Sequence, residues 1–251
     1  MTEVNTTKAK QYKIGQTLEG DKVSKLAQYQ RLVIGKKDQI VLIKYELIMS
    51  LISWIPGALG LFLRSKLYPL ILGQVGKNVI FGTNIVMRHP HKIRFCDNVI
   101  IDDNCLLDAK GSSNSGIIIG SNVYIGRNSI LSCKDGDIVL KDHVNLGFNC
   151  EIFSSSKVIL EEHALVAAYC YIVGGGNYSL ERTGLPISDQ PIFEDSGIVL
   201  QQNCWLGARV TVLDGVKIGH DSAIGASSLV TKEIPPFSIA IGVPAKVQRE
   251  R

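Results

Sequence analysis

The sequence has little charge, and its charges are spread thinly. Aspartate, glutamate, lysine and arginine make up 20% of the 251 residues, and the formal net charge is +4. Dense basic points occur at Lys36-Lys37 and near the end, at Lys246, Arg249 and Arg251. A nucleic-acid-binding chain usually concentrates lysine and arginine in an arm or a stripe. The composition therefore excludes an arginine-rich arm, while the 45% of apolar residues are enough to bury a core.

The marks of an exported protein are also lacking. Residues 1–39 are polar, without the apolar stretch of a secretory signal, and we expect them to form a partly ordered tail. Six cysteines in an exported protein would suggest disulfides. However, four of them follow an aliphatic residue at the same spacing, where a small buried side chain is expected: Cys105, Cys150, Cys170 and Cys204. We therefore expect reduced cysteines in the core of a cytoplasmic protein.

A period of six residues organises most of the chain. Near its end an aliphatic residue recurs at every sixth position, at Leu200, Leu206, Val212, Ile218, Ile224 and Val230. A helix repeats near 3.6 residues and a strand near 2, so neither element alone sustains six. Six residues suit one flat face of a parallel β-solenoid, with a short strand followed by a turn. The units begin at Val75 and, with small slips, predict about eight coils.

The fourth position of each unit supports this register. It is held by residues that accept a positive φ at low cost, namely Asn78, Asn84, Asn98, Asn104, Asn122, Asn128, Asn149 and Asn203, with Gly116, Gly175 and Gly215. A tight corner requires such a residue. The aliphatic, small and corner positions together predict an all-β solenoid.

An apolar run at 40–63 precedes the repeats. It is long enough for a membrane span, but two charges lie within it and Pro56-Gly57 interrupts it. Two short helices, at about 40–54 and 57–67, fit better and lie in an apolar helical region at 40–72. Three interpretations stay open: a cap on the open end of the solenoid, peripheral contact with a membrane surface, and a true span.

Several stretches resemble the hexapeptide-repeat acyltransferases. They include IGSNVYIGRNSI and IGHDSAIGASSLVTKEIPPFSIAIGVPAKV, and the likeness covers about residues 75–247. The helical preface and the segments MRHPHKI, DDNCLLDAKG and NLGFNCEIF are similar to one subgroup, the sugar and surface-polysaccharide O-acetyltransferases. The resemblance implies a left-handed parallel β-helix at 73–247 with a helical N-terminal region, a homotrimer, and a short C-terminal tail at 248–251.

The same resemblance implies an activity and a site. The activity is acyl transfer, with acetyl-CoA as co-substrate, to a hydroxyl of a sugar or surface-polysaccharide precursor. In the family, a loop brings a histidine that removes the hydroxyl proton. The matching loop at 173–199 interrupts the repeats, but where the subgroup has Gly-Gly-x-His-x-Phe, this chain has GGNYSL. Tyr178, or Asn177 if one gap is allowed, therefore stands in the place of the base.

Tyrosine is a weaker proton acceptor than histidine. A phenol with a pKa near 10 is ionised to about one part in a thousand at pH 7, whereas imidazole is mostly neutral and accepts a proton readily. His163, at a corner position before the loop, is an alternative base, although His143 and His163 also fit as ordinary corner residues. The missing histidine leaves a second function open: a catalytically impaired scaffold that binds a glycan, nucleotide or protein partner.

The resemblance also implies the positions that bind ligands. It places acetyl-CoA between subunits, along Trp205, Gly207, Ala208, Gly225, Ala226, Thr231, Lys232 and Lys246. Small residues let a pantetheine arm approach the backbone, and lysines attract phosphates. Polar loop residues suit sugar hydroxyls, namely Arg182, Asp189 and Gln190. We expect no metal, because His143 and His163 share one column without a third ligand.

Overall fold

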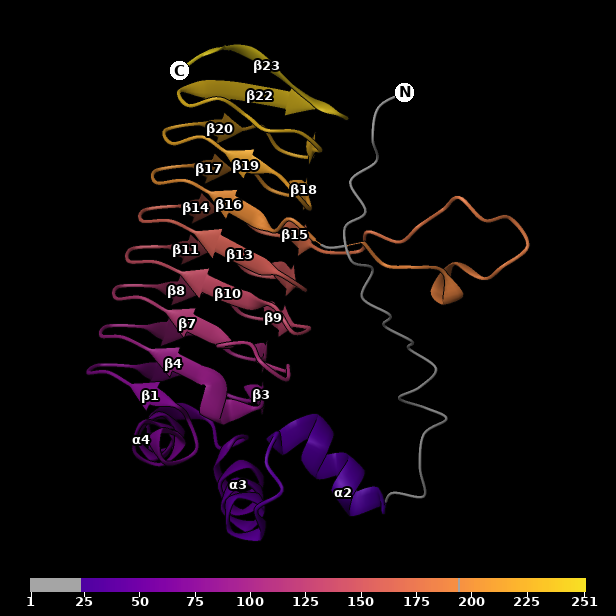
Figure 1. Ribbon diagram of the computed structural model, residues 1–251. Coiled ribbons are helices and arrows are strands. Elements are labelled where there is room, and N and C mark those ends of the chain that lie inside the picture. The colour runs from indigo at the N-terminus through magenta and orange to yellow at the C-terminus, as the bar shows by residue number, and fades with distance from the viewer. Residues whose placement is uncertain (1–23, 194) are drawn as a thin grey trace.

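The computed structural model describes residues 24–193 and 195–251. Its body is a parallel β-solenoid, with helices across one end and one long loop projecting from the side (Figure 1). Three sheets of seven, nine and seven strands run along the solenoid. In the second sheet eight of the nine strands are parallel and the last is antiparallel. The predicted solenoid of about eight coils is confirmed.

Seven successive turns of the chain each contribute one strand to each sheet, and the last two strands both join the second sheet. Sheet 1 contains β1 (Gln74–Val75), β4 (Ile93–Phe95), β7 (Ile117–Ile119), β10 (Asp137–Leu140), β13 (Lys157–Leu160), β16 (Ile198–Leu200) and β19 (Lys217–Ile218). Sheet 2 contains β2 (Ile80–Phe81), β5 (Ile100–Ile101), β8 (Tyr124–Ile125), β11 (Asn145–Leu146), β14 (Leu165–Val166), β17 (Trp205–Leu206), β20 (Ala223–Ile224), β22 (Ser238–Gly242) and β23 (Ala245–Glu250). Sheet 3 contains β3 (Val86–Arg88), β6 (Leu106–Asp108), β9 (Ile130–Cys133), β12 (Glu151–Ser154), β15 (Tyr171–Gly174), β18 (Thr211–Leu213) and β21 (Leu229–Val230).

The six-residue period arises because the large aliphatic residue of each unit points into the solenoid. Leu146, Ile172, Leu206 and Val212 are all fully buried. Stacked strands keep like residues in register, as when β12 pairs Ile152 with Ile172 of β15. The cysteines serve the same core: Cys150 and Cys170 are buried, and their thiols donate to the carbonyls of Ala167 and Gly207.

The corners confirm the predicted column of asparagines. We call them corner 1–2, corner 2–3 and corner 3–1, after the sheets that each corner joins in chain order. The eight predicted asparagines all have φ between 53° and 59°. His143 and His163 occupy the same positions in corner 1–2, with φ of 63° and 60°. Tyr169 and Arg209 adopt similar angles in corner 2–3, which is unusual for bulky side chains.

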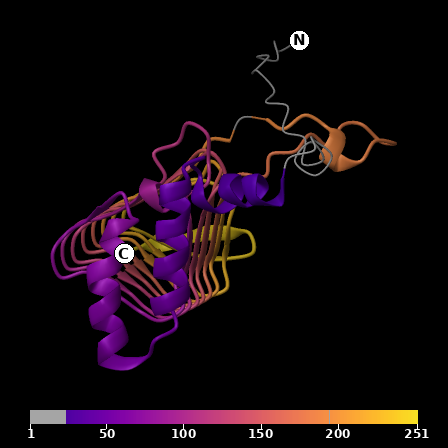
Figure 2. The same ribbon diagram turned by 90° about the horizontal axis from the view of Figure 1, so that it is seen from below.

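Helices cover the N-terminal end of the solenoid. They are α2 (Lys25–Tyr29), the π-helical turn η1 (Gln30–Ile34), α3 (Gln39–Ile52), α4 (Gly57–Leu67) and the short turn η2 (Tyr68–Leu70). Figure 2, seen from below, shows α3 and α4 lying side by side across the solenoid end. No helix in the described part of the chain is both long enough and apolar enough to cross a membrane.

Buried polar groups join these helices to the first coils. The guanidinium of Arg64 donates to the carbonyls of Phe81 (2.9 Å), Ile55 (2.7 Å) and Ile52 (3.3 Å). The hydroxyl of Tyr45 donates to the carbonyl of Met87 at 2.6 Å. The helical end is thus fixed to the solenoid through satisfied hydrogen bonds.

Two predicted boundaries look different in the structure. Residues 1–23 of the expected polar tail lie outside the described residues, while 24–34 form α2 and η1. At the other end β23 continues to Glu250, so most of the expected tail at 248–251 belongs to a strand. The strand forms because Ser238 and Ile239 of β22 pair with Glu250 and Arg249.

Candidate functional site

The long loop leaves the solenoid at corner 3–1, between β15 and β16. Gly174 is buried at the departure point, and a Cβ on Gly174 would lie 2.8 Å from a methyl carbon of Val158. A Cβ on Gly175 would collide with the hydroxyl of Ser155. Gly176 follows with a φ of 96°. Small residues are therefore required where the chain turns away from the coil.

Asp214 ties the two ends of the loop together. It lies in corner 3–1 of the next coil, directly after β18. Its carboxylate accepts the side-chain amide of Asn177 at 2.8 Å and the backbone N–H groups of Ser196 (2.8 Å) and Gly197 (2.9 Å). A charged acceptor makes such bonds stronger than neutral ones.

The loop also has structure of its own. Tyr178 and Ile192 form an antiparallel bridge, and Ser179 N–H donates to the carbonyl of Pro191 at 2.9 Å. Further out, the buried amide of Gln190 donates to the carbonyl of Arg182 at 2.9 Å and accepts the Arg182 N–H at 3.2 Å. These bonds close the outer part of the loop into a ring.

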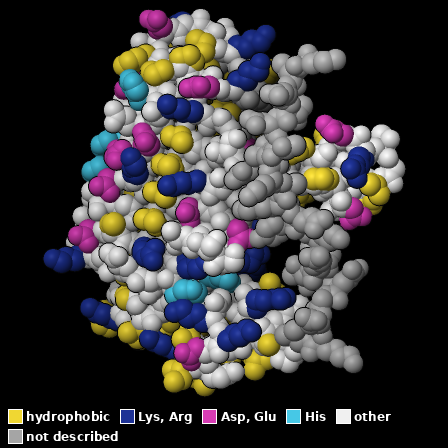
Figure 3. All heavy atoms as spheres, viewed as in Figure 1, with side chains coloured by type: hydrophobic (Ala, Val, Ile, Leu, Met, Phe, Trp, Pro, Cys, Tyr) yellow, Lys and Arg dark blue, Asp and Glu magenta, His cyan; other side chains and the backbone are white. Residues whose placement is uncertain are grey.

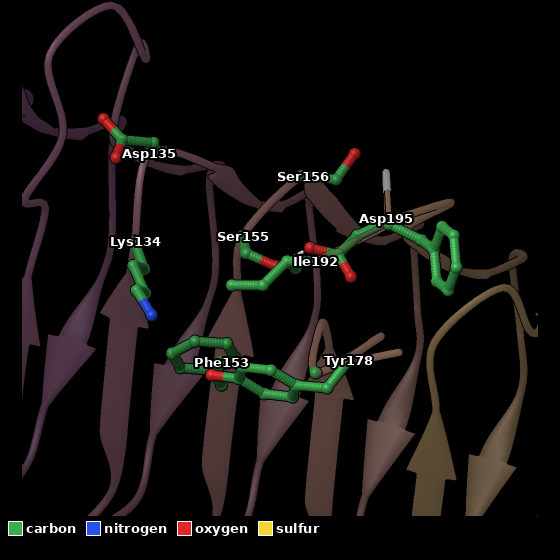
Figure 4. Close-up of a pocket in the computed structure, with 10 residues that line it drawn as sticks. Lys134, Asp135, Phe153, Ser155, Ser156, Tyr178, Ile192 and Asp195 are labelled. Carbon is green, nitrogen blue, oxygen red and sulfur yellow. Dashed lines mark hydrogen bonds between the residues drawn. The ribbon is translucent and has the colours of Figure 1, made fainter. Parts of the chain in front are cut away.

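A pocket of about 300 Å³ lies where the base of the loop meets corner 3–1. Two adjacent coils and the loop line it, through Lys134, Asp135, Phe153, Ser155, Ser156, Gly176, Tyr178, Ile192, Phe193 and Asp195. Figure 4 shows Lys134, Phe153 and Tyr178 along one part of the pocket, and Ser155, Ile192 and Asp195 along another. The pocket thus combines aromatic rings with one ammonium group and two carboxylates.

One carboxylate in this pocket is only partly satisfied. Oδ2 of Asp195 accepts the hydroxyl of Ser155, whose single proton is shared with the carbonyl of Gly174 at 3.0 Å. Oδ1 of Asp195 is buried and has no hydrogen-bond partner among the described residues. A buried acceptor without a partner usually has a functional or solvent explanation. Asp195 is therefore the polar group of the pocket whose hydrogen bonding is incomplete among the described residues.

The structure separates the three residues predicted for catalysis. Tyr178 lines the pocket, whereas the Asn177 side chain is occupied by Asp214 at the base of the loop. His163 lies in corner 1–2, on a different edge of the solenoid, and its ring stacks on that of His143 with 4.6 Å between centroids. Within one chain, therefore, Tyr178 and His163 do not share a site.

The positions predicted for acetyl-CoA lie in three places: the end of sheet 2 with corner 2–3, corner 3–1, and strand β23. Trp205, Gly207, Ala208, Gly225 and Ala226 lie along the end of sheet 2 and in corner 2–3, while Thr231 and Lys232 follow β21 in corner 3–1 and Lys246 lies in β23. Ala208 and Ala226 are exposed and stacked, since Ser227 N–H donates to the carbonyl of Ala208 at 2.8 Å. No single surface of one chain unites the two corners.

The glycines in this set have a structural reason to be there. A Cβ on Gly207 would lie 2.6 Å from the backbone nitrogen of Ala226 in the next coil. A Cβ on Gly225 would collide with the side chain of Ile241. Coil stacking alone therefore accounts for both glycines. Trp205, by contrast, is 49% exposed on the outer face of sheet 2, where packing in this chain does not require it.

The predicted sugar-binding residues differ in how available they are. Arg182 and Asp189 are exposed on the outer part of the loop, and Asp189 ends the short turn η4 (Ile187–Asp189). The amide of Gln190 is instead used to close the loop. The loop also exposes large apolar side chains, at Leu180, Leu185, Ile187 and Phe193, of which Phe193 lines the pocket.

Sequence reasoning missed most of the pocket. Lys134, Phe153 and Ser155 lie in repeats and carried no pattern of their own, although neighbouring coils are paired there: the Lys134 N–H donates to the carbonyl of Ser154. Asp195 and Asp214 bracket the end of the interruption. The signal that could have found them is position, since both lie within one coil of the loop. No cluster of three or more metal-ligating side chains occurs among residues 24–193 and 195–251.

Comparison with known proteins supports the predicted resemblance. Residues 197–232 match the family model described as bacterial transferase hexapeptide (six repeats). The chain is 34% identical over 137 residues to the galactoside O-acetyltransferase of Escherichia coli (strain K12), covering 52% of this chain and 55% of that protein. It is 31% identical over 153 residues to the galactoside O-acetyltransferase of Lactococcus lactis, covering 60% and 62%. The chain thus spans little more than half the length of these relatives.

Solved structures share the fold. The polysialic acid O-acetyltransferase OatWY aligns with a TM-score of 0.57 and 19% identity, over 71% of this chain and 86% of that one. AntD, an N-acyltransferase from Bacillus cereus in complex with dTDP and 3-hydroxybutyryl-CoA, aligns with a TM-score of 0.52 and 22% identity, over 79% and 90%. The resemblance to hexapeptide-repeat transferases, stated from the sequence, is confirmed.

Proposed function

We propose that this chain, a hexapeptide-repeat protein, is an acetyl-CoA-dependent O-acetyltransferase that acts on a sugar or surface-polysaccharide precursor. The observation that carries the proposal is the position of Tyr178. It stands where the family has its loop histidine, and it lines a pocket beside Lys134 and Asp195. The identity to galactoside O-acetyltransferases supports the reaction and the class of acceptor.

The reaction that we propose is transfer of the acetyl group from the sulfur of CoA to a hydroxyl oxygen of the acceptor. The acceptor hydroxyl attacks the carbonyl carbon of the acetyl thioester, the new C–O bond forms, and the C–S bond breaks to release CoA. A base must take the hydroxyl proton as the C–O bond forms. We assign this role to the Tyr178 hydroxyl, which takes the acceptor proton as it gives its own proton to the departing CoA sulfur. Asn177 positions Tyr178 through Asp214. His163 is the rival base and would have to meet the acceptor from another subunit.

We further propose that the site is completed in a homotrimer. Two features support this. The loop projects from the solenoid (Figure 1) and exposes Leu180, Leu185 and Ile187. The outer face of sheet 2 carries further apolar side chains, each at least 36% exposed: Ile80, Ile100, Tyr124, Leu165 and Trp205. Exposed apolar patches of this kind are typical of association surfaces. A neighbouring chain would bring corner 2–3 of one subunit against corner 3–1 of the other.

In that arrangement acetyl-CoA lies between two subunits. Ala208 and Ala226 leave room for the pantetheine arm next to Trp205, with Gly207 and Gly225 keeping the coils close. Thr231, Lys232 and Lys246 face the phosphates, for which lysine ammonium groups are suitable partners. Arg209, exposed beside Ala208, adds a further cation. The sugar contacts Arg182 and Asp189 on the loop that Gln190 holds closed.

The proposal places the protein in the cytoplasm, with peripheral contact at the inner face of the membrane through residues 40–67. Six free cysteines support a reducing compartment. Burial raises the pKa of the Cys105 thiol and that of the Cys204 thiol to about 11, so both stay protonated and unreactive at neutral pH. These cysteines therefore belong to the core and not to the chemistry.

The proposal is tested by thiol release from acetyl-CoA with a panel of activated sugars. Tyr178→Phe keeps the ring and removes the hydroxyl, so we expect kcat to fall by about a hundredfold or more with little change in thermal stability. Tyr171→Phe, an exposed tyrosine on β15 outside the pocket, is the matched control and should stay within about twofold. His163→Ala should behave like the control.

Each other outcome has a definite meaning. Loss of turnover in His163→Ala with normal Tyr178→Phe would move the base to His163. Binding of acetyl-CoA without turnover on any acceptor would favour the scaffold that binds a glycan, nucleotide or protein partner. Failure of the assembled protein to bind CoA at all would overturn the proposed transferase.

A further inference from the structure

The helical end of the solenoid exposes an unusual number of large apolar side chains. They lie on α3, on α4 and in the turn between them, and each is between 42% and 77% exposed: Ile40, Ile43, Leu47, Leu51, Trp54, Leu59, Leu61 and Phe62. We call these eight residues the helical-end surface. Monomeric soluble proteins seldom expose so many neighbouring apolar groups without a partner. Something outside the described chain is expected to cover them.

The spacing on α3 shows that this surface is a complete helix face. Ile40, Ile43, Leu47, Leu51 and Trp54 follow one another at steps of three or four residues, which places them on one side of the helix. The opposite side of α3, with Leu42, Tyr45, Ile48 and Ile52, is buried against the solenoid. The helix is thus apolar on both sides, and only one side has a partner in the described chain.

The apolar face cannot turn inward, because the helices are fixed. The hydroxyl of Tyr45 donates to the carbonyl of Met87. The guanidinium of Arg64 donates to three carbonyls, one each in the last residue of α3, the α3–α4 turn and β2. A Cβ on Gly60 would collide with the carbonyl of Ile55, so α4 packs closely on the turn. The exposed face is therefore presented as a rigid platform.

Positive charge predominates in the segment that carries this surface. Between residues 24 and 72 the exposed cations are Lys25, Arg31, Lys36, Lys37, Lys44 and Lys66. The same segment contains two acidic residues, Asp38 and Glu46. Asp38 caps α3 by accepting the Ile40 N–H at 2.8 Å, and Glu46 accepts the hydroxyl of Tyr29. Figure 3 shows lysine and arginine side chains over the whole of this face, several of them near the helical end.

We propose that the helical-end surface docks on an anionic lipid bilayer. Apolar side chains on a helix lying in the interface enter the boundary between headgroups and acyl chains, and lysines around them attract anionic lipids. Trp54 suits the same boundary, where tryptophan is enriched. Since α3 and α4 lie across the solenoid end, the solenoid stands away from the bilayer (Figure 2). This docking needs neither acetyl-CoA nor an acceptor.

A second copy of the chain is a poorer occupant. Bringing two helical ends face to face would bring together two segments that each carry six exposed cations and two carboxylates already bonded within the chain. Like charges across an interface oppose association. An anionic surface removes this conflict, because the same cations then become favourable.

The test is flotation of the full-length protein with vesicles. Wild-type protein is expected to float with vesicles of phosphatidylglycerol and phosphatidylcholine, and less with phosphatidylcholine alone. A triple variant, Leu47→Gln with Leu51→Gln and Phe62→Gln, should lower the partition coefficient by about a hundredfold or more, because each exposed side chain loses much of its transfer free energy. Circular dichroism should show unchanged helix and strand content.

A matched triple variant at the other end of the solenoid is the control. Phe237→Gln, Ile241→Gln and Val247→Gln replace three side chains that are 46% to 52% exposed near the last strands, and vesicle binding should stay at the wild-type level. Replacing Lys36, Lys37 and Lys44 by glutamine tests charge separately, with a loss of about fivefold per lysine on phosphatidylglycerol vesicles that disappears in high salt. This variant also keeps the test decisive if the first triple does not fold.

Two results would overturn the proposal. One is wild-type protein that remains entirely in the soluble fraction with phosphatidylglycerol vesicles. The other is a helical-end triple variant that still floats like wild type. Light scattering addresses the second copy: if the triple variant halves the particle mass and vesicles bind neither protein, the surface joins two copies. Loss of acetyl transfer in Tyr178→Phe leaves all of these outcomes unchanged.

Discussion

Two segments of this chain depart from the six-residue repeat, and the solenoid holds them in opposite ways. The helical end at 24–72 is fixed by buried polar groups, with Arg64 1% exposed and Tyr45 5% exposed. The loop at 175–197 is held at its base by Asp214 and by the bond between Ser155 and Asp195, while its outer part bonds to itself. Both segments expose large apolar side chains. They differ in the property that depends on their contacts, which is stability for the helical end and activity for the loop.

The helical end therefore acts as a stabilising cap of the solenoid, whereas the loop is a projection that the solenoid does not need for its stability. An unpaired end of a solenoid leaves strand edges and apolar side chains uncovered, so covering it contributes to the stability of the whole stack. A loop between two coils leaves the stack intact, because β15 still pairs with β12 and β18. Substitutions in the helical end should therefore lower stability, whereas substitutions in the loop should lower activity.

The largest expected effect is a loss of stability from a change in the helical cap. Arg64→Ala removes a buried side chain and leaves the carbonyls of Phe81, Ile55 and Ile52 without their donor. We expect a loss of about 3 kcal/mol in the free energy of unfolding, since unsatisfied buried acceptors and a cavity both contribute. Urea unfolding measures it, with Lys66→Ala on the same helix as the exposed control, expected below about 0.5 kcal/mol. A loss under about 1 kcal/mol in Arg64→Ala would contradict the idea that the helical end stabilises the solenoid.

The same region should respond to acid. His91 lies in the turn before β4, and burial, together with the nearby Lys36, lowers its pKa to about 4. Its pKa in the unfolded chain is about 6.5, so between pH 6.5 and 4 the unfolded state binds a proton that the folded state does not. Stability is then complete above pH 6.5 and falls as the pH decreases toward 4.

The 1.5 pH units between 6.5 and 5, at about 1.4 kcal/mol per unit, set an upper limit of about 2 kcal/mol at pH 5, and solvent screening of the half-buried ring reduces the expected loss to about 1 kcal/mol. Thermal unfolding at pH 7 and pH 5 checks it. His91→Gln should remove much of this pH dependence, whereas His163→Gln, in corner 1–2 several coils away, should retain it. If both variants keep the slope of the wild-type protein, the titrating groups lie elsewhere.

The sequence alone was sufficient for the solenoid because its signal is local and repeated. Each coil restates the same three positions, and the asparagine corners appear at the predicted residues with the expected positive φ. Tyr169 and Arg209 escaped this reading, since bulky side chains seldom adopt such angles and the stacking of neighbouring coils imposes them. For the repeats, then, pattern and structure agree wherever the corner residue is the favoured one.

The candidate site could be predicted only in part, because it depends on where an irregular segment returns. The loop and Tyr178 were visible as an interruption and as a departure from the family motif. The pocket forms because the loop brings Asp195 back onto Ser155 and Tyr178 next to Phe153, which no periodicity encodes. The role of Gln190 inside the loop likewise depends on a contact eight residues away in the chain.

The smallest effect on stability, and the sharpest test of the comparison, is expected from Asp214→Ala. This change removes the acceptor shared by Asn177, Ser196 and Gly197 while leaving all strand pairs of the solenoid in place. Because the carboxylate lies in a corner near the surface, we expect the free energy of unfolding to fall by about 1 kcal/mol or less. Activity should fall far more, since Tyr178 is no longer held over the pocket.

Two measurements distinguish these effects. Hydrogen exchange should accelerate at the amides of 176–196 and stay unchanged in β15 and β18, because local opening affects the loop alone. In the thiol-release assay kcat/KM should fall by about tenfold or more, as a misplaced catalytic group loses much of its advantage. Asp214→Asn retains part of the acceptor and should lie between wild type and Asp214→Ala. The contrary outcome is normal turnover in Asp214→Ala together with fast hydrogen exchange in the loop. It would show that activity does not need the bonds from Asp214 to the loop, and that the acceptor does not react in this pocket.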